Sequence, residues 1–104
     1  MKNFKNYDVI KAEINNIPFN LWVADTDAKR KTGLSKINSM PSNCGMIFIF
    51  DKPRTNPFTM RETNIPLTII FLDDDLKIVS SKKGLPRQKE LIYPGDSYRY
   101  VIEI

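Results

Sequence analysis

The sequence predicts a mainly β fold: a compact, mostly antiparallel β-barrel or sandwich of about seven short strands with one short helix. Short apolar runs alternate with turn residues, and long helical periods are rare. Two segments, 45–50 and 65–72, are apolar on both faces, as strands buried on both sides are. Strands this short need a closed or two-layered arrangement to protect their edges. The length of 104 residues suits a single domain over 1–104.

The first element that we expect is a β-hairpin. Apolar and polar residues alternate over 10–14 and again over 17–23. Asn15 and Asn16 separate the two runs, and asparagine tolerates the positive φ that a tight primed turn requires.

A short helix should follow the hairpin. Asp25 or Thr26 can cap it, with Asp25 favoured, and Gly33 suits a C-terminal position with positive φ. About two turns of helix are not stable alone. We therefore expect the helix to pack on the sheet through Ala28 and Leu34.

The remaining elements are a loop, several strands and their turns. In chain order we expect a loop over 38–43, strands over 45–50 and 65–72 with a short extended piece over 58–60 between them, a turn over 73–75, a returning strand over 76–79, an exposed loop over 82–90, a turn over 93–96 and a closing strand over 98–104. The three aspartates at 73–75 fit a hairpin turn better than a calcium loop, because the glycine and distal glutamate of an EF-hand are missing. We expect Phe48, Phe50, Ile69 and Phe71 to lie in the core.

The composition excludes several classes of chemistry. The chain has no histidine and one cysteine, Cys44. It therefore cannot form an intramolecular disulfide, a Cys/His zinc site or a Ser-His-Asp triad. No metal or cofactor is predicted, and Cys44 is expected to pack as a small hydrophobic residue.

The net charge of +4 is spread along the chain. It fits ordinary solubility better than nucleic-acid binding, which would need Lys29-Arg30-Lys31 and Lys82-Lys83 on one face. The longest run without a charge, 37–50, is too short and too polar to span a membrane. No signal peptide follows the N-terminal lysines, so we expect no membrane partner and a cytoplasmic location.

Four segments carry a resemblance to a known family. They are Ala24-Asp25-Thr26 with Arg30 and Gly33-Leu34, the strand 45–51, the block 58–73 and the strand 100–104. In this order and spacing the chain resembles the family catalogued as domain of unknown function 192, from about Val23 to its end. The resemblance implies a compact, mainly β domain found in bacteria, archaea and some viruses. It implies no reaction, because none is established for the family.

The sequence departs from the usual residues of that family. Ser35 stands where Met is usual, Thr59 where Trp is usual and Thr68 where Asp is usual. Arg61-Glu62-Thr63 replaces the usual Lys-Asn-Thr. The resemblance therefore implies that an aromatic wall and a carboxylate of the family pattern are missing here. A common family ligand would be bound differently or not at all.

The candidate site is the polar cluster beside the buried strands. Arg61, Thr63 and Asn64 could bind a small polar or anionic ligand, with Arg30 and Glu62 beside them. The alternatives are a loop tied to its own backbone, or structural ion pairs of Arg61 with Asp51 or Asp73 and of Arg30 with Glu62.

Three functions follow from this cluster and the charge pattern. The favoured hypothesis is a small non-enzymatic binding or accessory domain for such a ligand or for a protein partner. A second is a carboxylate-dependent enzyme acting on a carbohydrate or nucleotide, with Asp25 and Glu62 as its acid pair. A third is weak nucleic-acid binding.

Overall fold

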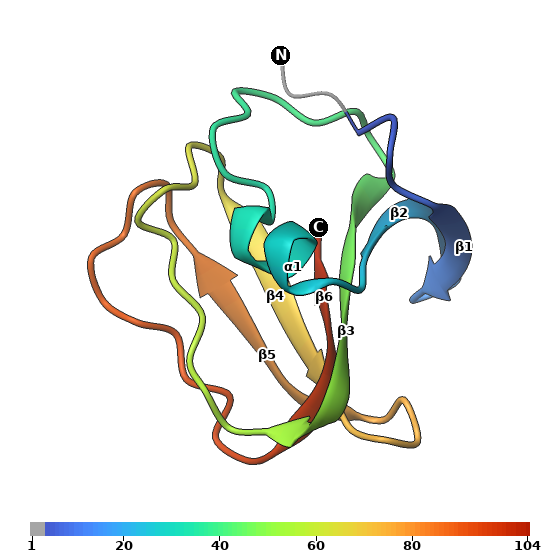
Figure 1. Cartoon of the computed structure of the whole chain (residues 1–104), viewed down its shortest axis with the longest axis vertical. Coiled ribbons are helices and arrows are strands. Elements are labelled where there is room, and N and C mark those ends of the chain that lie inside the picture. The colour runs from blue at the N-terminus through green and yellow to red at the C-terminus, as the bar shows by residue number, and fades with distance from the viewer. Residues whose placement is uncertain (1–3) are drawn as a thin grey trace.

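Six strands and one helix form within residues 4–104, the part of the chain that the computed structural model describes (Figure 1). In chain order they are β1 (Val9–Ile14), β2 (Ile17–Ala24), α1 (Asp27–Thr32), β3 (Cys44–Arg54), β4 (Leu67–Leu72), β5 (Ile78–Gly84) and β6 (Tyr98–Glu103). They make one mixed sheet in the order β1-β2-β3-β6-β4-β5. The prediction of a mainly β fold with one short helix is confirmed.

Local turn chemistry explains the hairpins. Asn15 and Asn16 have φ values of 53° and 65°, so the predicted primed turn joins β1 to β2. Between β4 and β5, the Asp73 carboxylate accepts hydrogen bonds from the backbone N–H groups of Asp75 and Lys77, each at 2.9 Å. The three aspartates therefore form a hairpin turn, as predicted.

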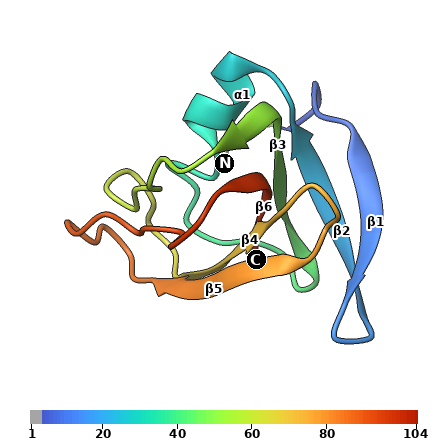
Figure 2. The same ribbon diagram turned by 90° about the horizontal axis from the view of Figure 1, so that it is seen from below.

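The helix belongs to a crossover between parallel strands. β2 and β3 pair in parallel, whereas the other neighbouring strands pair antiparallel. Two parallel strands need a crossover connection, because the chain must return to the end of the sheet at which the first strand begins. The segment 25–43 supplies it and carries α1 across one face, as Figure 2 shows.

Several expectations about the strands are corrected. The sheet is open, with β1 and β5 at its edges, so neither a closed barrel nor a sandwich is seen. Six strands form instead of seven, because Phe58–Met60 makes only a single bridge, between Phe58 and Ile92. Lys82 and Lys83 continue β5 opposite Ile69 and Thr68, although an exposed loop was predicted there. The sheet curls around the core, as Figure 2 shows, although its edge strands β1 and β5 do not pair with each other.

The core occupies both faces of the central strands. Phe48, Phe50, Ile69 and Phe71 belong to one buried cluster and are at most 6% exposed, which confirms the core prediction. Ile47 and Ile70, which alternate with them, belong to a second cluster. This explains why the two segments read as apolar throughout. No helix within 4–104 has the length and apolar composition needed to cross a membrane.

Candidate functional site

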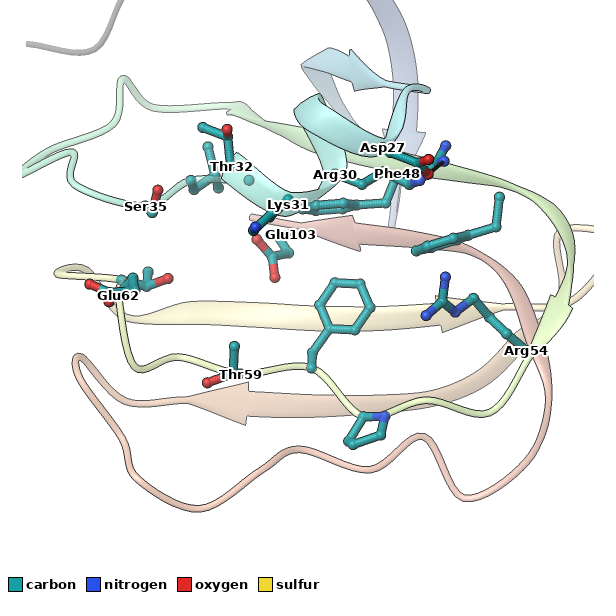
Figure 3. A pocket seen from close by; sticks show the side chains of 16 residues that line it. Asp27, Arg30, Lys31, Thr32, Ser35, Phe48, Arg54, Thr59, Glu62 and Glu103 are labelled. Atoms are coloured by element: carbon teal, nitrogen blue, oxygen red, sulfur yellow. Dashed lines mark hydrogen bonds and ion pairs between the residues drawn. The ribbon is translucent and has the colours of Figure 1, made fainter.

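A cavity of about 410 Å³ opens between α1, β3, β6 and the segment 57–63 (Figure 3). Its apolar wall includes three phenylalanines, Phe48 and Phe50 from β3 and Phe58 from the segment. Its charged lining is Asp27, Arg30, Lys31, Arg54, Glu62 and Glu103. Apolar walls with a few polar groups are typical of small-molecule sites.

The helix is held over the cavity by its two ends. At the N-terminus the Thr26 hydroxyl accepts a hydrogen bond from the backbone N–H of Lys29 at 3.2 Å, so Thr26 is the cap and the preference for Asp25 was wrong. At the C-terminus Gly33 has the predicted positive φ, 50°. Leu34 is buried as expected, but Ala28 is exposed. The reason is that the chain turns inward only after Gly33, so the residue following the helix makes the core contact.

Arg30 fastens the helix to β3. Its Nη1 donates to the backbone carbonyl of Ile49 at 2.7 Å, and its Nη2 pairs with Asp27 at 2.6 Å. The Arg30 guanidinium carbon lies 5.3 Å from the centre of the Phe50 ring. Arg30 therefore lines the cavity as a structural residue, and its ionic partner is Asp27, not Glu62.

Arg54 closes the same end of the cavity. Its guanidinium carbon lies 4.5 Å from the Phe50 ring centre, which suits a cation–π contact. Burial raises the pKa of the Tyr98 hydroxyl, an effect that the positive charge of Arg54 opposes. The Tyr98 hydroxyl donates to the backbone carbonyl of Asn56 at 2.7 Å. The Phe50 ring, which contacts Arg54, meets the Tyr98 ring edge to face with ring centres 5.6 Å apart.

Glu103 is the acidic group inside the cavity. In β6 it lies between Met46 of β3 and Ile69 of β4, both of which are fully buried. Its side chain points into the cavity (Figure 3), yet the residue is only 5% exposed. Burial raises the pKa of the Glu103 carboxyl from 4.5 to about 8. Among residues 4–104 no side chain pairs with this carboxyl.

The predicted polar cluster is split by the structure. Thr63, which is buried, and Glu62 line the cavity, together with Arg30. Arg61 does not: it is exposed, and its Nε donates to the backbone carbonyl of Lys89 at 3.1 Å. Asn64 is also outside, where its amide donates to Asn38 at 3.4 Å. The expectation that Arg61 and Asn64 line the pocket is therefore corrected.

The sequence interpretation missed Glu103 and Arg54. The available signal for Glu103 was a single carboxylate in an otherwise apolar terminal strand, 100–104. It supplies a buried carboxylate, although the family's usual carboxylate is replaced by Thr68. Arg54 gave a weaker signal, because it follows Pro53 in what resembled the end of a strand.

The other predicted arrangements are not assembled at this cavity. Asp25 is exposed and does not line it, so the predicted Asp25–Glu62 pair does not share the site. The elements α1 and β5, which carry the two groups of basic residues, lie on opposite sides of the molecule in Figure 2. Lys29 also donates to the backbone carbonyl of Asn6 at 2.8 Å. Within 4–104, no three metal-ligating side chains cluster together.

Comparison with known proteins agrees with the sequence resemblance. The model of the DUF192 family, described as "Uncharacterized ACR", matches residues 9–104. No curated protein matches the chain. A solved structure from Sinorhizobium meliloti 1021, of a protein described as a candidate transcription regulator, is similar at 25% identity with a TM-score of 0.78, over 94% of this chain and 78% of that one. A protein of unknown function from Novosphingobium aromaticivorans is similar at 25% identity with a TM-score of 0.81, over 94% of this chain and 72% of that one.

Proposed function

Because the chain belongs to the family of domain of unknown function 192, for which no activity is described, we propose a function from the cavity itself: the protein is a non-enzymatic binding domain for a small polar ligand with an apolar body. The ligand would lie between α1 and the segment 57–63, against the phenylalanines of β3. This places the ligand beside Thr63, Glu62 and Arg30 of the predicted cluster, and away from Arg61 and Asn64.

The unpartnered Glu103 carboxyl carries this proposal. Burying a carboxyl group without a hydrogen-bonding partner is costly, so a protein interior normally supplies one. Here the side chain is directed into a cavity instead of toward a protein donor. A ligand that hydrogen-bonds to Glu103 would offset this cost. Ligand binding therefore explains why a carboxyl group lies at this position, which packing alone does not.

The size and lining of the cavity support the same function. A volume of about 410 Å³ lies within the range of small-molecule sites. Three positions where the sequence departs from the usual family residues, Ser35, Thr59 and Glu62, all line the cavity. Two of these departures, Ser35 and Thr59, put a small polar side chain at the cavity where a large apolar one is usual in the family.

A carboxylate-dependent hydrolase is the second candidate, and Glu103 and Glu62 would be its acid pair. The observation that favours it is the raised pKa of Glu103, since a buried acid that keeps its proton near neutral pH can donate it to a leaving group. Chromogenic glycosides and nucleoside phosphates test this candidate. Turnover that is lost in both Glu103→Gln and Glu62→Gln would favour it over simple binding.

A thermal-shift screen of small polar and amphipathic compounds tests the binding function. A true ligand at about 100 times its Kd should stabilise the protein by about 2.7 kcal/mol. Thr59→Trp, which restores the usual family residue and fills the cavity, should abolish the shift. Arg61→Ala, outside the cavity, should leave it unchanged. The proposal fails if no compound gives a shift, or if the shifts survive Thr59→Trp.

A further inference from the structure

We infer that the ligand is a primary amine, whose ammonium group pairs with the Glu103 carboxylate while its apolar body packs against Phe48 and Phe58. This inference rests on the proposed binding function and names the chemical class of the ligand. It is carried by the position of Glu103 in the cavity and by the groups around it.

The surroundings of Glu103 leave its acceptor capacity unused. An ionised carboxylate has two oxygens and about four acceptor sites. Its cross-strand neighbours Met46 and Ile69 offer no side-chain donor. A bound group must therefore bring donors. An ammonium brings three donors and the opposite charge, whereas a hydroxyl brings one donor and no charge.

The other charged groups that line the cavity do not compensate Glu103. From α1, Arg30 is bound to Asp27 and to the carbonyl of Ile49, and Lys31 is exposed. From β3, Arg54 lies over the Phe50 ring. From the segment 57–63, Glu62 is exposed, and its nearest cation is Arg87 at 3.6 Å. Burial is accordingly the cause that raises the pKa of Glu103, and a ligand that carries a positive charge would stabilise the ionised carboxylate in the cavity.

The rest of the cavity suits the body of such a ligand. Phe48 and Phe58 meet edge to face, with ring centres 5.2 Å apart, and both line the cavity. Aromatic rings favour apolar groups and also attract cations. Thr63 is the other buried polar residue of the lining, and its hydroxyl can accept a further ammonium hydrogen.

Proton release separates an amine from other ligands. At pH 7, a carboxyl with a pKa of about 8 holds its proton in about 90% of free molecules. An ammonium needs the ionised form, so binding at pH 7 should release about 0.9 proton per ligand. Affinity should rise about 100-fold between pH 6 and pH 9, because alkylammonium groups stay charged over this range. A carboxylic acid or alcohol bound to the protonated form would show no rise.

The experiment compares three compounds of matched shape: 2-phenylethylamine, 2-phenylethanol and 3-phenylpropanoate. Calorimetry at pH 6, 7, 8 and 9, in buffers of different ionisation enthalpy, measures the Kd and the number of protons released. We expect the amine to bind at least 10-fold more tightly than the other two compounds. Glu103→Gln should remove this preference, the proton release and the pH dependence. Arg61→Ala should change none of them.

Other outcomes overturn the inference and bear differently on the binding function. Equal or tighter binding of the alcohol or the acid, still sensitive to Thr59→Trp, would overturn the amine and leave the binding function intact. The same holds if none of the three compounds binds while the thermal-shift screen finds a ligand that has no amine group. If the thermal-shift screen finds no ligand at all, both the amine inference and the proposed binding function fail. If Glu103→Gln does not fold, the pH series on the unsubstituted protein decides alone, and flat affinity from pH 6 to 9 overturns the inference.

Discussion

Replacing Glu103 by glutamine should stabilise the free protein at neutral pH. The pKa of Glu103 is about 8 in the folded state against 4.5 ordinarily. Below pH 4.5 both states hold the proton, and the carboxyl carries no penalty. As pH rises toward 8, only the unfolded state releases the proton, so the free energy of unfolding falls. Glutamine keeps the shape of the protonated acid and does not titrate, so it avoids this loss.

The size of the effect follows from the shift. One pKa unit corresponds to about 1.36 kcal/mol, so the penalty is about 3 kcal/mol at pH 7 and about 5 kcal/mol above pH 8. For a domain of this length, about 3 kcal/mol raises Tm by roughly 10–20 °C. Near pH 4 the two proteins should be equally stable.

Urea denaturation from pH 4 to pH 9 measures the difference directly. Glu62→Gln is the matched control, because this carboxylate lines the same cavity but is exposed. Its free energy of unfolding should stay within about 0.5 kcal/mol of the unsubstituted protein at each pH. Parallel pH profiles for Glu103→Gln and the unsubstituted protein would refute the reasoning, since they would mean that Glu103 ionises in the folded state as it does in the unfolded chain.

Other substitutions test the framework around the cavity. Phe71→Ala should lower the free energy of unfolding by about 3–5 kcal/mol, because the ring is fully buried among other aromatic rings; an unchanged urea midpoint would contradict its core position. Gly33→Ala should cost about 1–2 kcal/mol through its positive φ, and a neutral result would contradict that conformation. Arg30→Ala should lower Tm, and Arg30→Lys should not restore it, because one ammonium cannot reproduce the forked contacts to Ile49 and Asp27. Arg61→Ala should shift the free energy of unfolding by no more than about 0.5 kcal/mol, and a larger loss would reveal a structural role.

Local chemistry made the individual elements predictable. The positive φ of Asn15, Asn16 and Gly33 follows from residue types that tolerate it, and a turn residue acts on its own backbone. The buried strands β3 and β4 follow from the continuous apolar runs 45–50 and 65–72, which need cover on both faces whatever their partners are. The helix was predictable from its capping residues, although Thr26 and not Asp25 accepts the hydrogen bond. The family resemblance was readable from motif order, and the match over 9–104 confirms it.

The lining of the cavity could not be predicted, because it depends on contacts between segments that are far apart in the sequence. Alternation indicates which residues of one strand share a face, but it does not indicate which strands pair. The insertion of β6 between β3 and β4 places Glu103 between Met46 and Ile69 and leaves the residue only 5% exposed. In the same way, the path of the segment 57–63 turns Thr63 toward the cavity and leaves Arg61 beside Lys89. The sequence by itself therefore determined the family, the main strands and the helix. Only the tertiary structure decided that the Glu103 carboxyl is buried and which side chains line the cavity with it, because burial arises from segments that are distant along the chain.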